Sequence, residues 1–214
     1  MNHFETQVNQ AIDTIAAVAT PHGRGGIAVI RISGPSVQTI GKDLLGHLPK
    51  TRYAEYLSFL AADRTTIDEG LAIYFQAPNS FTGEDVLELQ GHGGPVIANC
   101  LLQRVLQLGA RLARPGEFSE RAFLNSKLDL VQAEAISDLI DAESEQAARA
   151  AIRSLQGEFS KRIDGMREAL IALRMCLEAS IDFSDETIDV LKDSELKRKL
   201  NAILVDIREI KNLA

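Results

Sequence analysis

The apolar residues of this chain change their spacing near residue 118, and this change constrains the fold more than any other feature of the sequence. Before it, short aliphatic runs such as Ile27–Ser33 and Val86–Gln90 are separated by glycine and proline, which is typical of strands. After it, apolar residues recur at steps of three and four, which is typical of amphipathic helices. We therefore predict an α+β protein: a mixed α/β domain over residues 1–118, followed by long helices of an all-α bundle over 119–214.

The first domain is predicted to contain five strands and two helices. Pro35 and Pro95 each lie where a helix is expected to begin, because proline fits the first helical turn, and Gly109 is a natural end for the second helix. The predicted strands are Ile15–Ala19, Ile27–Ser33, Leu57–Leu60, Leu71–Phe75 and Val86–Gln90, with a polar turn at Asp63–Gly70.

The second domain is predicted to contain a helix near its start, where Asp129 and Gln132 have the spacing of a capping box, and then a long uninterrupted helix. Ser144 can cap it, and its apolar residues run on to Leu177, which gives a rod of roughly 50 Å at ~1.5 Å per residue. Gly157 and Gly165 are expected to weaken this helix without ending it. A last helix is expected from near Ser194, and its apolar stripe still continues at Ala214 without a cap. We therefore expect this chain to be the front of a longer protein.

Two charged residues lie in the middle of apolar strands. Glu88 interrupts Val86–Gln90, and Arg31 interrupts Ile27–Ser33. A charge in such a setting is costly unless a partner compensates it. One interpretation is a structural ion pair. The other is a polar clamp in an apolar pocket, in which the carboxylate accepts two parallel hydrogen bonds from an amidine-like edge such as that of a pterin.

The glycine-rich motifs are open to more than one interpretation. Gly91–Gly94 leads into a helix and predicts either an anion site or a tight turn that needs positive φ. His92, within this motif, could act as an acid or base in catalysis, or it could have a structural role. Gly23–Gly26 leads into a strand rather than a helix, so it does not fit a dinucleotide-binding loop. The sequence contains no GxxxxGK[ST] motif, so no phosphate-binding loop for GTP or ATP is expected.

Composition narrows the class of protein further. The net charge of −7 means that any nucleic-acid contact must come from a local basic patch or a partner. Cys100 and Cys176 are far apart, which favours a reducing compartment and gives no cysteine-based metal site. The acidic residues Asp182, Asp185, Glu186 and Asp189 are interpreted as a solvated linker rather than a cation site. No apolar run approaches ~20 residues, so we expect no membrane span and a cytoplasmic location.

Four longer segments closely resemble the MnmE (TrmE) family of tRNA modification GTPases: Ala19–Gly34, Pro78–Pro95, Arg114–Asp141 and Ser154–Ser160. The similarity covers nearly the whole chain from Asp13 onward, whereas Met1–Ile12 does not match. The resemblance implies an N-terminal domain that binds a 5-formyltetrahydrofolate-type ligand and forms a homodimer, followed by a helical domain. It also implies a Ras-like GTPase domain inserted at about the point where this chain stops, so the sites for GTP, potassium and magnesium are expected to be missing.

The family's folate-contacting positions correspond to Arg31, Glu88 and Lys127 in this chain. Lys127 would otherwise be interpreted as a solvated lysine, so its assignment depends on the resemblance alone. The resemblance implies that the intact protein is a GTP hydrolase that works with the flavoprotein MnmG, which supplies FAD. Together they would add a carboxymethylaminomethyl group (or its aminomethyl relative) to carbon five of the wobble uridine in certain tRNAs. No catalytic residue and no metal ligand are expected in this chain.

Two other functions fit the same residues. One is a stand-alone folate-dependent one-carbon transferase, similar in fold to aminomethyltransferases. The other is a purely structural dimer module in which Arg31 and Glu88 pair only with each other.

Overall fold

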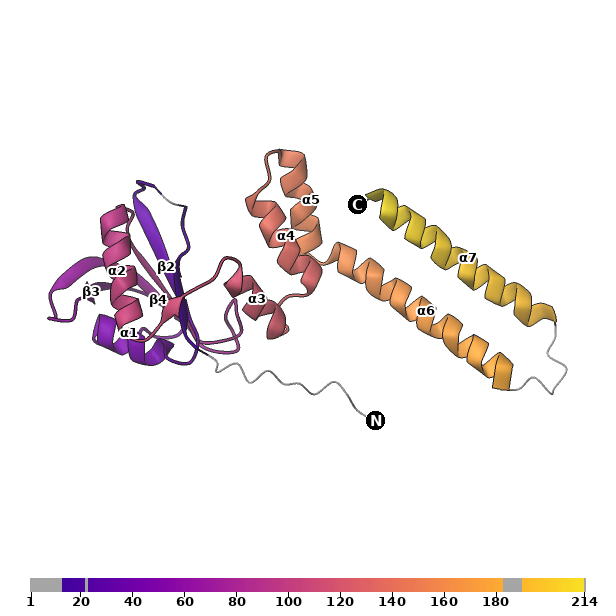
Figure 1. The fold of residues 1–214 in the computed structure, drawn as a ribbon, viewed down its shortest axis with the longest axis horizontal. Coiled ribbons are helices and arrows are strands. Elements are labelled where there is room, and N and C mark those ends of the chain that lie inside the picture. The colour runs from indigo at the N-terminus through magenta and orange to yellow at the C-terminus, as the bar shows by residue number, and fades with distance from the viewer. Residues whose placement is uncertain (1–12, 22, 183–189, 214) are drawn as a thin grey trace. The chain divides into compact units, whose positions relative to one another are not determined.

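A computed structural model describes residues 13–21, 23–182 and 190–213, and the chain divides into two compact units between Asp129 and Leu130 (Figure 1). The first unit contains a sheet and helices α1–α3, and the second contains helices α4–α7. The predicted fold class, a mixed α/β domain followed by a helical domain, is confirmed. The boundary predicted after residue 118 falls inside α3 (Glu117–Leu124), and the structure includes that whole helix in the first unit.

The first unit is built on a six-stranded sheet with the order β3-β4-β5-β2-β1-β6. Every neighbouring pair is antiparallel except β1 and β6, which are parallel. The strands are β1 (Ile15–Val18), β2 (Ile27–Ser33), β3 (Ala54–Leu60), β4 (Thr66–Phe75), β5 (Val86–His92) and β6 (Arg111–Leu112).

The strand β4 begins earlier than the sequence indicates. Thr66 to Gly70 were predicted to lie in a polar turn, but they pair with β3 along the edge of the sheet, where Leu57 lies opposite Gly70 and Phe59 opposite Asp68. Only Leu71–Phe75 of β4 also pair with β5, so Thr66–Gly70 have a paired strand on one side alone. Such a segment can carry polar side chains, so the apolar pattern alone does not reveal it.

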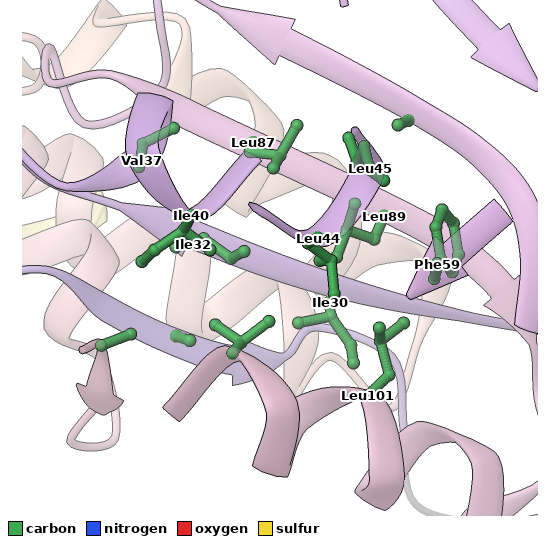
Figure 2. Close-up of a cluster of buried hydrophobic side chains, with 14 of the residues drawn as sticks. Ile30, Ile32, Val37, Ile40, Leu44, Leu45, Phe59, Leu87, Leu89 and Leu101 are labelled. Carbon is green, nitrogen blue, oxygen red and sulfur yellow. The ribbon is translucent and has the colours of Figure 1, made fainter. Parts of the chain in front are cut away.

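Helices α1 (Val37–Leu45) and α2 (Pro95–Gln107) pack on one face of the sheet and bury its apolar residues (Figure 2). Ile30, Ile32, Leu87 and Leu89 are at most 1% exposed. Side chains alternate between the two faces of a strand. Arg31 and Glu88 therefore lie on the face opposite the two helices.

The second unit consists of α4 (Leu130–Ile140), α5 (Glu145–Leu155), α6 (Glu158–Asp182) and α7 (Val190–Leu213). The predicted cap is confirmed, because the Ser144 hydroxyl accepts a hydrogen bond of 3.2 Å from the backbone N–H of Ala147. The side chains of Ala135, Ala151, Leu173 and Ile203 are buried, one on each helix.

The prediction of one uninterrupted helix from Ser144 to Leu177 is wrong. Gly157 has φ of +80°, a left-handed conformation that ends an α-helix and suits glycine. The chain therefore forms two helices, α5 and α6, on either side of this residue, whereas Gly165 lies inside α6 as predicted. The apolar spacing passes through the break because each helix buries apolar residues of its own, such as Ala151 and Leu173.

Among the described residues, no helix is both long enough and apolar enough to span a membrane. The helix α7 begins at Val190, before the predicted start at Ser194. The acidic residues Asp185, Glu186 and Asp189, interpreted above as part of a linker, lie outside the described residues.

Candidate functional site

Arg31 and Glu88 form an ion pair across two neighbouring strands. They lie directly opposite each other in the antiparallel pairing of β2 and β5, where side chains on the same face are close enough to interact. Nε and Nη2 of Arg31 both lie 2.8 Å from Oε1 of Glu88. The two side chains are 28% and 18% exposed, so the pair is partly accessible. The structure thus brings together the two charged residues that the sequence singled out.

The contact is asymmetric. Both nitrogens of Arg31 contact Oε1, and among the described residues no hydrogen bond to Oε2 of Glu88 is present. A carboxylate oxygen can accept hydrogen bonds along its own lone pairs. Glu88 can therefore keep its contact with Arg31 and still accept a hydrogen bond from a ligand.

Two aromatic rings flank the Arg31 guanidinium. Its Cζ lies 5.3 Å from the centre of the Phe81 ring and 5.7 Å from that of Phe118, within the range of cation–π attraction. Phe81 comes from the loop between β4 and β5, and Phe118 from α3. Sequence reasoning missed both rings, because no pattern along the chain relates these two positions to Arg31.

Lys127 lies in the segment after α3 and contacts the β4–β5 loop. Its Nζ donates a hydrogen bond of 3.1 Å to the carbonyl of Pro78. Its methylene groups pass Gly83, where an added Cβ would lie 3.2 Å from Cγ of the lysine. The structure therefore connects Lys127 to the loop that carries Phe81. Among the described residues, Lys127 forms no hydrogen bond or ion pair with Arg31 or Glu88.

A buried charged network holds α3 against the sheet and the β4–β5 loop. Its centre is Arg121, whose side chain is 10% exposed and contacts three acidic residues. Nη2 lies 2.6 Å from Asp13 and 3.2 Å from Glu117, and Nη1 lies 3.1 Å from Glu84. Sequence reasoning also missed this network, because Asp13 and Glu84 are far from Arg121 in the chain and none of its members interrupts an apolar run.

Glu117 is the most buried acid of this network, at 2% exposed. The hydrogen bond from Arg111 is the main cause that lowers the pKa of Glu117 to about 2, and the backbone N–H of Arg114 and the side chain of Arg121 add to it against the effect of burial. The carboxylate is therefore charged throughout the physiological range.

The same network fixes the β4–β5 loop. The hydroxyl of Ser33, at the end of β2, donates a hydrogen bond of 2.6 Å to Glu84 and lies 2.7 Å from the hydroxyl of Thr82. The side-chain amide of Asn125 donates a hydrogen bond of 2.7 Å to the Thr82 carbonyl. Buried polar contacts therefore hold the β4–β5 loop in place, and the position of this loop determines that of Phe81.

The Gly91–Gly94 motif has a structural explanation in close backbone packing. A Cβ on Gly93 would lie 2.4 Å from the carbonyl oxygen of Gly25, so only glycine fits there. Neither Gly91 nor Gly93 has positive φ, which differs from the tight turn considered above. A cavity of about 460 Å³ lies beside this junction, lined by residues that include Val18, Ile27, Pro95 and Leu102. Arg31, Glu88 and Lys127 are not among its lining residues.

His92 of the same motif pairs with Asp68. Its Nδ1 lies 2.6 Å from Oδ1 of Asp68, and its backbone N–H donates a hydrogen bond of 2.7 Å to Oδ2. Burial alone would raise the pKa of Asp68, but these contacts from His92 outweigh it and lower the pKa. Within the described part of the chain, no group of three or more His, Cys, Asp or Glu side chains is arranged to hold a metal ion.

Two family models match this chain. The model described as "GTP-binding protein TrmE N-terminus" matches residues 14–127, and the model described as "MnmE helical domain" matches residues 130–214. Among curated proteins, the chain is 60% identical over 203 residues to a protein named tRNA modification GTPase MnmE from Yersinia pseudotuberculosis serotype O:1b (strain IP 31758). A protein of the same name from Yersinia pestis bv. Antiqua (strain Angola) matches equally well. These alignments cover 94% of this chain and 45% of each relative, so the chain spans less than half the length of these relatives.

Proposed function

This chain belongs to the MnmE (TrmE) family, and from that premise we propose that it binds a 5-formyltetrahydrofolate-type ligand through Arg31, Glu88 and Lys127. The single observation that carries the proposal is the ion pair of Arg31 and Glu88, which lies partly exposed on the sheet face opposite α1 and α2. A charged pair in that position offers both a carboxylate and a guanidinium to one ligand.

Each of the three residues has a chemical role in this proposal. Glu88 accepts hydrogen bonds from the amidine-like edge of the pterin, and Oε2 is the oxygen best placed for this because Arg31 contacts Oε1. Arg31 and Lys127 complement the anionic and carbonyl oxygens of the ligand. All three bind and orient the ligand, and none of them is assigned a step of chemistry.

The function of the longer protein is a second part of the proposal. The relatives are named tRNA modification GTPases, and this chain spans 45% of their length. We place GTP hydrolysis, with potassium and magnesium, in the remaining part of such a protein. The complete protein would be a cytoplasmic homodimer, joined through its N-terminal domain, that acts with the flavoprotein MnmG and its FAD to modify the wobble uridine of tRNA.

A second candidate function is a structural module that binds no folate. The observation that favours it is the same ion pair, because Arg31 and Glu88 are already at hydrogen-bonding distance from each other. In that case the pair would only stabilise the pairing of β2 with β5.

Calorimetric titration of the 214-residue chain with 5-formyltetrahydrofolate separates the two functions. We expect saturable binding that Glu88→Ala weakens by about 2–5 kcal/mol, because a member of a desolvated charged contact is lost. Glu69→Ala is the matched control, since Glu69 is an exposed carboxylate on β4 that contacts Ser58. Absence of saturable heat with the wild-type chain would favour the structural module, and equal affinity of the Glu88→Ala variant would remove Glu88 from the site.

A further inference from the structure

Phe81 and Phe118 are unusual because two separate segments bring their rings to one guanidinium. The rings lie 5.3 and 5.7 Å from Cζ of Arg31. Phe81 is 37% exposed, and Phe118 is partly exposed. Both therefore keep accessible aromatic surface beside the charged pair.

Both rings are held on firmly placed backbone. Thr82, next to Phe81, is 0% exposed and hydrogen-bonded through both its hydroxyl and its carbonyl. Glu117, next to Phe118, is 2% exposed and bound by Arg111 and Arg121. A site whose walls are fixed before the ligand arrives loses less entropy on binding.

The group that both rings contact, the Arg31 guanidinium, indicates the kind of ligand that they select. A guanidinium is planar and delocalised, and it presents several N–H groups along one edge. The 2-amino-pyrimidine part of a reduced pterin has the same N–C(N)–N unit within a flat six-membered ring. A pterin can thus donate to Glu88 as Arg31 does, while its ring face contacts a phenyl ring.

Building on the proposed folate site, we infer that Phe81 and Phe118 are its specificity-determining residues, and that they select the flat 2-amino-4-oxopyrimidine ring of the reduced pterin by stacking. Glu88 accepts hydrogen bonds from the N–H edge of that ring, and the two phenyl rings stack on its face. Stacking on an aromatic side chain tolerates different substituents on the ligand ring but requires a flat π-system. The aminobenzoyl ring of a folate can also stack, but it has no such N–H edge, so the edge contact with Glu88 together with the two phenyl rings favours the pterin half.

The test compares, by calorimetry, the folate affinity of variants of the 214-residue chain that lose an aromatic ring at position 81 or 118 with that of variants that keep one. We expect Phe81→Leu and Phe118→Leu each to weaken binding of 5-formyltetrahydrofolate about tenfold, and Phe81→Tyr and Phe118→Tyr to bind like the wild type. The matched control is Phe123→Leu, which removes a ring that is 41% exposed on the same helix α3. Titration with p-aminobenzoylglutamate, which lacks the pterin, should give the same result for the wild-type chain and the two leucine variants.

Each result decides the question. Equal folate affinity of Phe81→Leu, Phe118→Leu and Phe123→Leu, with Glu88→Ala still weakened, would overturn the stacking inference and leave the proposed folate site intact. Absence of saturable binding by the wild-type chain would instead contradict both the proposed function and this inference. Loss of self-association at unchanged folate affinity would mean that the rings contact a second copy of the chain, which also overturns the inference.

A measurement on the wild-type chain covers the case in which a leucine variant does not fold. Stacking lowers the ultraviolet absorbance of a bound pterin, so we expect a hypochromic difference spectrum when 6-hydroxymethylpterin is added. Binding of this pterin without hypochromism would contradict stacking, whichever variants fold.

Discussion

Arg121 joins helix α3 to the β4–β5 loop through Glu84, with Nη1 of the arginine 3.1 Å from Oε1 of the acid. This contact connects the two segments that carry Phe118 and Phe81. The two rings in turn lie against Arg31, which pairs with Glu88. The geometry of the candidate site therefore depends on a buried network that takes no direct part in it.

The first prediction concerns Arg121 itself. Replacing it in Arg121→Met should lower the free energy of unfolding by about 3 kcal/mol, because the largely buried Glu84 is left without its cation while Glu117 and Asp13 keep Arg111. Urea denaturation followed by circular dichroism measures the change. Arg149→Met is the control, because Arg149 forms an exposed pair with Glu145 and such pairs contribute no more than about 0.5 kcal/mol. Similar losses in both variants would show that the Arg121 network adds nothing to stability.

The second prediction is a pH dependence caused by Glu117. Its pKa is about 2 in the folded chain, against about 4.5 for an unperturbed glutamate, so the folded state favours the charged form. The resulting stabilisation is fully present above pH ~4.5 and is lost as the pH falls toward ~2, with an upper size of about 3 kcal/mol. Urea denaturation of the wild type and Glu117→Gln should show a stability difference at neutral pH that shrinks over this acid range. A difference that stays constant down to pH ~2 would contradict the assignment.

The third prediction concerns the coupling between Arg31 and Glu88. A double-mutant cycle of Arg31→Met and Glu88→Gln should give a coupling free energy of about 1 kcal/mol, because the pair is only partly exposed and lies between directly opposed strand residues. The exposed helical pair of Arg174 and Glu178, measured in the same way, should give about 0.3–0.5 kcal/mol. Equal couplings for the two pairs would show that the position in the sheet does not strengthen the contact.

The fourth prediction uses the two glycines in the region expected to form one helix. Gly157→Ala should destabilise the chain by about 1–2 kcal/mol, since its φ of +80° places a Cβ in a strained conformation. Gly165→Ala should stabilise it by about 0.5–1 kcal/mol, because Gly165 lies within α6 and an added Cβ meets no atom within 4 Å. Thermal unfolding of the two variants gives the signs directly. A stabilising Gly157→Ala would mean that α5 and α6 can join into one helix.

Most strands and helices of the first unit are predictable from the sequence because their apolar patterns are local. Ile27–Ser33 was predicted as a strand with the bounds that the structure shows, and the spacing of Val37, Ile40 and Leu44 predicted the buried face of α1. The break at Gly157 could not be predicted, because glycine occurs both inside helices and at their ends and the apolar spacing continues past it. The early start of β4 was missed for the opposite reason, since its first residues are mostly polar and pair with β3 alone.

The sequence by itself determined the class of fold, the family and the two charges that interrupt apolar strands, because alternation, helical spacing and motifs are properties of neighbouring residues. Only the tertiary structure decided that Arg31 lies opposite Glu88, that Phe81 and Phe118 flank the guanidinium, and that Arg121 fixes both segments. Those contacts follow from strand register and from the packing of α3. Register and packing depend on the whole sheet, and no local pattern encodes them.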